Sequence, residues 1–196
     1  MIDNKEVFMK ALGIVGSPRK GGNCEILTTH CLKAIAEEGL ETELVSLAGL
    51  DIRPCTACEA CRGTDTCVIN DDLLPVYRKM KEADAIIIAA PVYMGSLAGL
   101  AKCFMERAGY IDRNNKRVFT GKVGGPIVVA RRAGQNFTLA QMMFWFQLCG
   151  FLTPGSNYWN MAIGRAKGDV VNDEEGMRTA WNFGKNVAEL LKKLNR

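Results

Sequence analysis

The stretch "DAIIIAAP", residues 84–91, is the strongest indication of the fold. It is a continuous apolar run between Asp84 and Pro91, and strands with this pattern are buried on both faces in parallel sheets. A strand with one face in solvent would alternate apolar and polar residues instead. The stretch therefore predicts a central parallel strand whose sheet is covered by helices on both faces.

Runs rich in strand-forming residues alternate with helical patterns on either side of this stretch. Further strands are predicted at 8–15, 41–47, 123–130 and 151–164. Helices are predicted at 23–39, 97–110, 137–150 and 173–195, and another opens at Asp71 or Asp72. With right-handed crossovers, this alternation predicts a doubly wound α/β fold whose ligands bind beyond the carboxyl ends of the strands.

Length and composition predict one domain over residues 1–196, with a cysteine-rich loop insertion at about 51–70. The net charge is +4 and the basic residues are scattered, which argues against a nucleic-acid partner. The N-terminus lacks the pattern of a signal peptide, and no apolar run approaches the roughly 18 residues that span a bilayer. We expect a cytoplasmic protein with no membrane partner.

The segment "GSPRKGGNCE", residues 16–25, follows the first predicted strand and opens the first predicted helix. Free backbone N–H groups and the helix dipole favour an anion at such a position. Ser17 and Asn23 can add side-chain hydrogen bonds, and Arg19 can pair its charge with a phosphate. A terminal monophosphate suits this loop best.

Other uses of the loop remain open. Gly16 and Gly21 are followed by Gly22 and Asn23, so the Lys and the hydroxyl of a triphosphate-binding loop are missing. The pattern G-x-G-x-x-G is also absent, although Glu41 or Glu43 lies about where a ribose-binding acid would stand in a dinucleotide site. A plain strand-to-helix turn without a ligand is the third alternative.

The segment "CTACEACRGTDTC", residues 55–67, has the spacing C-x2-C-x2-C-x5-C. Disulfides seldom persist in a reducing cytosol, so clustered cysteines there indicate a metal or redox site. A [4Fe–4S] cluster needs four thiolates, and two-residue gaps let a short loop wrap around it. Structural zinc usually takes two pairs separated by a longer insert. The segment favours a [4Fe–4S] cluster on Cys55, Cys58, Cys61 and Cys67, with zinc or unligated cysteines as alternatives.

Three motifs in order carry a resemblance to a known family. "GSPRKGGN" after the first strand, the cysteine segment after the second and "PVYMGS" (91–96) after the third resemble the iron–sulfur flavoproteins and the related NAD(P)H-dependent FMN reductases. The resemblance runs from Ala11 to Leu191. It implies a flavodoxin-like fold with five parallel strands in the order 2-1-3-4-5 and with the cysteine segment on the flavin edge of the sheet.

The resemblance also implies which residues contact FMN. The phosphate would be held by Ser17, Arg19, Gly22, Asn23 and Cys24. The isoalloxazine ring would lie along Pro91, Val92, Tyr93, Met94, Gly95 and Ser96, whose N–H groups would open the third helix, and it would be bordered by Ala130, Arg131, Gly134 and Gln135. The alternatives are that Tyr93 and Met94 merely fill the core and that Arg131 is a solvated charge.

The resemblance implies an FMN-dependent oxidoreductase in which the flavin, and no catalytic side chain, carries the chemistry. Electrons would arrive from NAD(P)H or a ferredoxin and leave to an unidentified acceptor. The alternatives are a non-catalytic flavodoxin-like electron carrier and an NAD-binding enzyme without flavin. The segment "MMFWFQLCGF" (142–151) is apolar around the whole helix, which together with the resemblance predicts a homodimer or homotetramer.

Overall fold

The computed structural model describes residues 9–195, so Phe8, where the first strand is expected to begin, lies outside the described residues. Strands are β1 (Lys10–Val15), β2 (Glu41–Ser46), β3 (Ala85–Tyr93), β4 (Ser96–Leu97), β5 (Val123–Ala130) and β6 (Met161–Ile163). Helices are α1 (Asn23–Glu37), α2 (Leu73–Glu82), α3 (Gly99–Arg113), α4 (Gln135–Leu148) and α5 (Glu174–Leu194), with a 3-10 turn at Asp169–Asn172.

The described strands form one sheet whose parallel path runs β2-β1-β3-β5-β6. β3 lies between β1 and β5, with Ile87 opposite Gly13 on one side and Gly125 on the other. The predicted parallel order is therefore present, but the sheet has six strands rather than five. The sixth is β4, which pairs antiparallel with the end of β3 because the chain reverses there before it enters α3.

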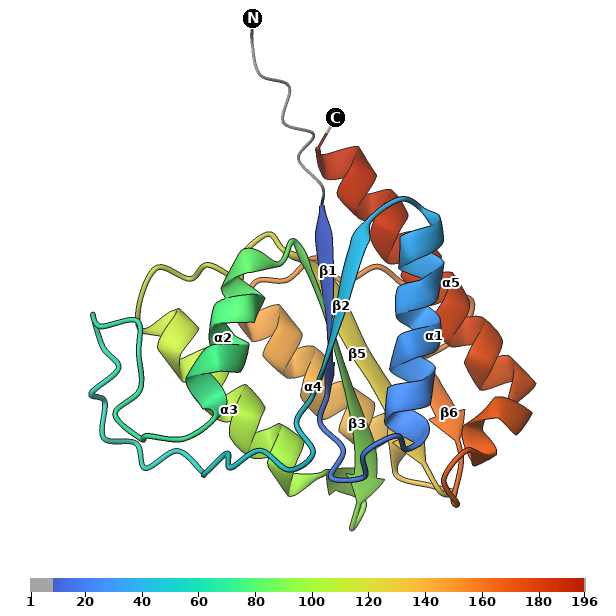
Figure 1. Cartoon of the computed structure of the whole chain (residues 1–196), viewed down its shortest axis with the longest axis horizontal. Coiled ribbons are helices and arrows are strands. Elements are labelled where there is room, and N and C mark those ends of the chain that lie inside the picture. Colours follow the sequence, from blue (N-terminus) through green and yellow to red (C-terminus); the bar gives the residue numbers. More distant parts are fainter. Residues whose placement is uncertain (1–8, 196) are drawn as a thin grey trace, which may run out of the picture.

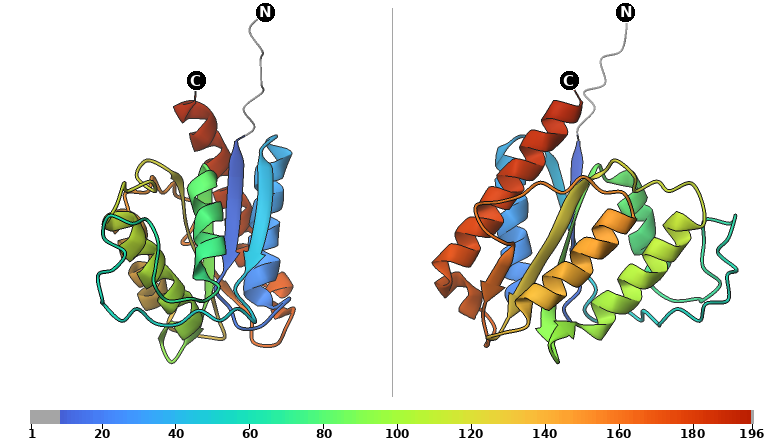
Figure 2. Two further views of the ribbon diagram at one scale, coloured as in Figure 1. Left: turned by 60° about the vertical axis from the view of Figure 1, so that its left-hand side comes forward. Right: turned by 180° about the vertical axis from the view of Figure 1, so that it is seen from behind.

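Helices cover both faces of the sheet, with α1 and α5 on one face and α2, α3 and α4 on the other (Figures 1 and 2). Alternate residues of β3 enter the two resulting cores: Ile86 and Ile88 pack with the second group of helices, and Ala85 and Ile87 with the first. This explains why "DAIIIAAP" contains no polar residue between its ends. Among residues 9–195, none of the helices combines the length and the apolar character that crossing a membrane requires.

The last predicted strand, 151–164, is the element that differs most from its prediction. Only Met161–Ile163 pairs with β5, and Leu152 makes an isolated parallel bridge to Val123. Between them the chain follows α5 instead: the Gly155 carbonyl accepts from Asn186 Nδ2 at 2.8 Å, and Ser156 Oγ donates to the Thr179 carbonyl at 2.8 Å. These side-chain bonds replace the ladder that a full strand would have formed.

The carboxyl ends of β1, β3, β5 and β6 meet at the lower edge in Figure 1, and the loops that leave them lie together there. This is the edge at which open α/β sheets bind ligands.

Candidate functional site

Four loops at the carboxyl edge enclose a pocket of about 290 Å³. They follow β1, β3, β5 and β6 in turn. The lining residues are Ser17, Arg19, Gly22, Asn23, Cys24, Pro91, Val92, Tyr93, Val129, Arg131, Gly164, Arg165 and Lys167. The structure thus brings the expected phosphate loop, part of "PVYMGS" and Arg131 to one cavity.

The loop after β1 is held by its own hydrogen bonds. Ser17 Oγ accepts from the Arg19 amide at 3.2 Å, and the Arg19 carbonyl accepts from the Gly22 amide at 3.1 Å. Gly21 adopts φ +63°, and its amide donates to Glu25 Oε2 at 2.8 Å. The first N–H groups of α1 lack intrahelical acceptors, as at any helix start, so they are available to an anion in the pocket.

Asn23 lines the pocket, but its side chain is bonded to the loop after β6. Asn23 Oδ1 accepts from the Gly168 amide at 2.8 Å, and Asn23 Nδ2 donates to the Ala166 carbonyl at 2.8 Å. The expected hydrogen bond from Asn23 to a phosphate would therefore compete with the hydrogen bonds that the Asn23 amide already makes to this loop. In this structure Asn23 fixes the loop that carries Arg165 and Lys167.

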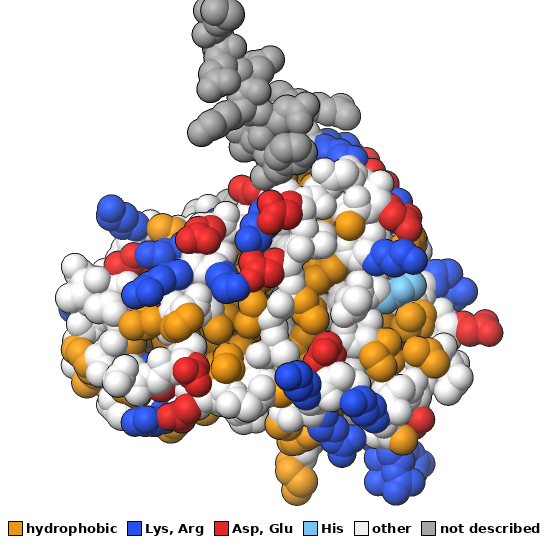
Figure 3. All heavy atoms as spheres, in the orientation of Figure 1, with side chains coloured by type: hydrophobic (Ala, Val, Ile, Leu, Met, Phe, Trp, Pro, Cys, Tyr) orange, Lys and Arg blue, Asp and Glu red, His pale blue; other side chains and the backbone are white. Residues whose placement is uncertain are grey.

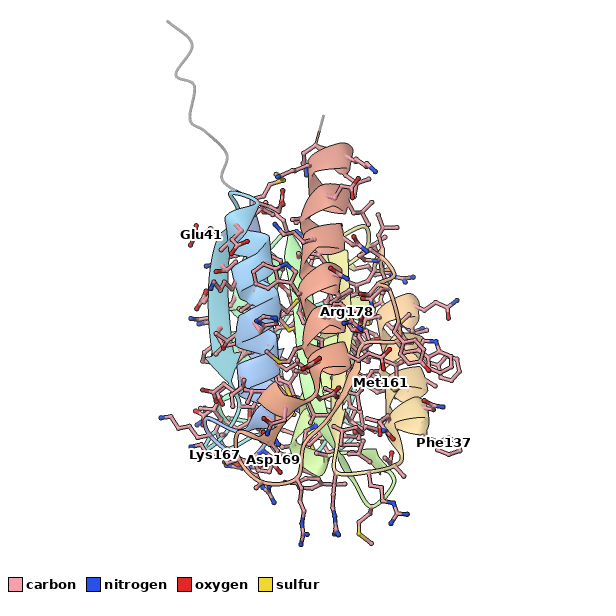
Figure 4. All side chains as sticks on the ribbon, turned by 90° about the vertical axis from the view of Figure 1, so that its right-hand side faces the viewer. Glu41, Phe137, Met161, Lys167, Asp169 and Arg178 are labelled. Carbon is pink, nitrogen blue, oxygen red and sulfur yellow. The ribbon has the colours of Figure 1, made fainter. Side chains whose placement is uncertain are left out.

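Sequence reasoning missed Val129 and Gly164 of the pocket lining and, more important, the basic residues Arg165 and Lys167, which follow the last strand. The Lys167 ammonium lies beside Gly21, since a Cβ built on that glycine would be 2.9 Å from Lys167 Nζ. Arg19 Nη1 donates to the Arg165 carbonyl at 3.2 Å. Figure 4 shows Lys167 and Asp169 next to the start of α1, and Figure 3 shows basic side chains gathered below that helix. The available signal was their position directly after the last strand.

The pocket is basic, and the described part of the chain places no neutralising carboxylate beside its cations. Within residues 9–195, no carboxylate lies within ion-pairing distance of Arg19, Arg131, Arg165 or Lys167. Cations from three loops thus surround the start of α1, and among residues 9–195 none has a carboxylate partner, which favours a small multiply charged anion.

The segment "PVYMGS" forms a hairpin and not the start of a helix. Met94 and Gly95 have φ values of +50° and +80°, as a two-residue hairpin turn of type I′ requires, and Tyr93 pairs with Ser96. α3 begins only at Gly99, so the expected N–H groups of a helix start are replaced by those of a turn. Tyr93 is 41% exposed and Met94 is fully exposed, which excludes core filling as their role.

Of the residues expected at the end of β5 and in the loop after it, only Arg131 lines the main pocket. Ala130 is buried, and its carbonyl accepts from the Gly164 amide at 2.9 Å. Gly134 packs against Val92 and Gly95 of the hairpin. The expected contacts that do not line the main pocket are Met94, Gly95, Ser96, Ala130, Gly134 and Gln135. Met94 and Gly95 instead line an adjoining open depression of about 390 Å³ with Val92, Arg131, Arg132 and Ala133.

The cysteine segment encloses a second cavity of about 60 Å³. Cys55, Cys58, Cys61 and Cys67 all line it, and all four are free thiols. The remaining wall is formed mainly by Arg107, Tyr110 and Ile111 of α3.

Each of the four sulfur atoms has a polar hydrogen-bond donor. The Ala57 amide donates to Cys55 Sγ at 3.4 Å, Asn114 Nδ2 to Cys61 Sγ at 3.5 Å, and Arg107 Nη2 to Cys67 Sγ at 3.2 Å. Hydrogen bonds from the Ala60 backbone and the Thr56 hydroxyl lower the pKa of Cys58. Such donors stabilise thiolates, the form of cysteine that binds metal.

The four thiols line one cavity without converging on one point. Among the described residues, no three His, Cys, Asp or Glu side chains converge on a single-ion position, whereas four thiols surround one cavity. Ala57 and Glu59 hold left-handed backbone conformations, with φ of +52° and +58°, which turn the chain around that cavity. Four cysteines whose thiolates are stabilised by N–H donors are the ligand set of an iron–sulfur cluster and also of a structural zinc site.

The two cavities are separate. They share no lining residue. The cysteine cavity lies beside Tyr110, about 16 Å along α3 from its first residue, Gly99, at a rise of about 1.5 Å per residue. The right-hand view of Figure 2 shows the segment standing out beside α3. The expectation that it lies on the flavin edge of the sheet is therefore wrong: the chain leaves that edge after β2 and packs on the far half of α3.

Known proteins of the flavin-reductase and iron–sulfur flavoprotein families are similar to this chain along most of its length. The NADPH-dependent FMN reductase family matches residues 9–166. An iron–sulfur flavoprotein of Methanocaldococcus jannaschii is 40% identical, with 96% of this chain and 100% of that protein covered. An iron–sulfur flavoprotein of Methanosarcina thermophila is 36% identical, with 96% and 98% covered. A WrbA-like flavodoxin from Agrobacterium tumefaciens matches in structure with a TM-score of 0.65 at 18% identity, over 94% of this chain and 98% of that one.

Proposed function

The chain belongs to the NADPH-dependent FMN reductase family and to the iron–sulfur flavoproteins, and from this premise we propose that it is an FMN-dependent oxidoreductase. The basic pocket at the carboxyl edge carries the proposal. It combines a helix start with four cations that have no carboxylate partner among the described residues, as a terminal phosphate requires. In a nicotinamide dinucleotide the two phosphates link the two nucleosides and are not terminal, so such a ligand suits this pocket less well.

The phosphate end of FMN would be held by the N–H groups that open α1 and by Arg19, Arg165 and Lys167. The ring would lie toward Tyr93 and the hairpin, which border the pocket on its other side. When bound, FMN supplies the two-electron and one-electron redox chemistry. The protein would supply position and positive charge, and Arg131 with Arg132 would face the phosphates of an NAD(P)H donor at the adjoining depression.

A non-catalytic electron carrier is the second candidate, because the fold is that of flavodoxins. The two are separated by steady-state oxidation of NADH and NADPH by FMN-loaded protein, with reduced ferredoxin as the other donor. We expect turnover with a nicotinamide. Negligible turnover with both nicotinamides, alongside fast reduction by ferredoxin, would assign the carrier, and failure to bind FMN would refute both.

The four cysteines would hold a [4Fe–4S] cluster. The support is the thiol-lined cavity, the donors to all four sulfurs, and the name of the relatives that cover nearly the whole chain. A cluster accepts one electron at a time. FMN, which can give up its electrons singly, would therefore couple a two-electron donor to a one-electron acceptor.

We also propose a homodimer or homotetramer. Large apolar side chains are exposed on α4 and on the loop before β6: Phe137 is 78% exposed, Phe144 69% and Trp159 56%. Figure 4 shows Phe137 projecting away from the sheet. An apolar surface of this kind favours contact with another subunit.

A further inference from the structure

Arg107 is a buried charge whose partners are Cys67 of the cysteine segment and residues that flank the segment on both sides. Its side chain comes from α3 and is 1% exposed. It forms an ion pair with the buried carboxylate of Asp71, with Arg107 Nη2 3.1 Å from Asp71 Oδ1. A buried guanidinium is costly unless it is paired, so this pair accounts for the charge but not for the other contacts.

The other contacts of Arg107 are with the backbone just before and just after the segment and with its last cysteine. Arg107 Nη1 donates to the Arg53 carbonyl at 3.2 Å, and Nη2 donates to the Ile69 carbonyl at 3.4 Å. Nη2 also donates to Cys67 Sγ at 3.2 Å, which is shorter than the bonds to Cys55 Sγ and Cys61 Sγ. One side chain therefore closes the loop and places a positive N–H group on a ligand atom.

A positive hydrogen-bond donor on a cluster thiolate favours the reduced cluster, because reduction adds negative charge to the sulfurs. Among the donors to Cys55, Cys61 and Cys67, only Arg107 is charged, since those to Cys55 and Cys61 are neutral amides. Because the Arg107 side chain is itself buried, its charge acts on the sulfur at short range with little solvent screening.

We propose that Arg107 positions Cys67 and raises the reduction potential of the cluster. The inference rests on the proposed iron–sulfur site and assigns one side chain the control of its potential. Arg107 is a positioning residue, since it acts through the cysteine. A purely structural Arg107 would fasten the loop without changing the potential.

The test compares anaerobically purified wild type with R107Q and R107K. The double variant D71N/R107Q removes both charges of the pair, so that no unpaired carboxylate stays buried. The matched control is R113Q, which removes an exposed charge from the same helix. Iron and FMN are quantified in each protein, and the cluster potential is measured by a redox titration followed by electron paramagnetic resonance of the reduced cluster.

We expect R107Q and D71N/R107Q to keep iron and FMN and to show a lower cluster potential, R107K to show a smaller decrease, and R113Q to match wild type. A wild-type potential in both Gln variants would overturn the proposal. Loss of iron from all Arg107 variants with FMN retained would assign the residue to loop fastening alone and would also overturn it. Wild-type protein without iron would refute the iron–sulfur site itself, and this inference with it.

Discussion

Asn23 shows how one side chain joins two parts of the pocket that are far apart in the chain. Its amide oxygen and nitrogen both bond the loop at 166–168, more than 140 positions away. That loop carries Lys167, whose ammonium lies over Gly21. Asn23 therefore acts on an anion mainly by holding basic residues in place, and less by contacting it.

Replacing Asn23 with Ala should weaken FMN binding more than riboflavin binding, because the displaced cations face the phosphate and not the ring. Losing two side-chain hydrogen bonds that order the loop should cost FMN affinity about tenfold, or about 1.4 kcal/mol. Quenching of flavin fluorescence measures both affinities.

The control is Asn186→Ala, which removes a comparable side-chain bond to the Gly155 carbonyl away from the pocket. Equal losses for FMN and riboflavin in N23A, or a loss of the same size in N186A, would contradict the role given to Asn23.

At the scale of elements, ion pairs join the end of α1 to α5 on the side distant from the pocket. Glu38, which follows α1, accepts from Lys185 at 2.8 Å and from Lys192 at 2.7 Å, both on α5. Hydrogen bonds from Lys185 and then Lys192 lower the pKa of Glu38 from 4.5 to about 2. The pair is exposed to solvent, so its effect on stability is reduced by screening.

Glu38→Gln should lower the thermal unfolding midpoint at neutral pH. The pKa of Glu38 is lower in the folded than in the unfolded protein, so its stabilisation is complete above the unfolded value and is lost as pH falls toward about 2. The difference in unfolding midpoint between wild type and E38Q should thus be largest near neutral pH and should decrease progressively below about pH 4.5. Calorimetry across this range measures it.

Glu106→Gln serves as the comparison, since Glu106 pairs only with Lys102 of its own helix among the described residues. If the difference in unfolding midpoint between wild type and E38Q stayed constant with pH, lost packing and not the lost charge would be its cause.

At the scale of the whole molecule, the two cavities are independent because no residue lines both. Cys58→Ser should therefore abolish iron binding and leave FMN content unchanged. Iron and flavin quantitation of anaerobically prepared protein tests this, with roughly four irons per chain expected in wild type.

Cys103→Ser is the control, because Cys103 lies on α3 outside the cysteine segment and does not line its cavity. Retention of iron in C58S, or its loss in C103S, would show that the ligands are assigned wrongly.

Assembly is the second property at this scale. Phe144→Glu should shift the protein from a dimer or tetramer toward monomer in sedimentation velocity, since it places a charge in the exposed apolar surface of α4. Val171→Glu is the control: Val171 is 55% exposed but lies in the 3-10 turn before α5. A monomeric wild type, or equal shifts in both variants, would contradict the proposed contact surface.

The local pattern of the sequence determined the elements and the positions of the glycine-rich loop and the cysteine segment. The run 84–91 is apolar throughout because β3 faces a core on each side, and residues 16–25 open a helix after a strand, as their glycines and charges indicate. The cysteine spacing predicted a [4Fe–4S] cluster on four cysteines; the structure places the four thiols around one cavity, and the cluster itself stays a prediction. These features follow from neighbours along the chain, which periodicity and spacing report directly.

Only the tertiary structure decided which distant side chains complete each site. Asn23 bonds a loop more than 140 positions away, Arg107 reaches Cys67 across 40, and Lys167 meets Gly21 where the last strand ends beside the first helix. The chain's reversal after Tyr93 and the departure of the cysteine segment from the sheet edge were likewise decided by packing. Such contacts depend on how helices and loops pack over the sheet, and a local sequence pattern carries no record of that packing.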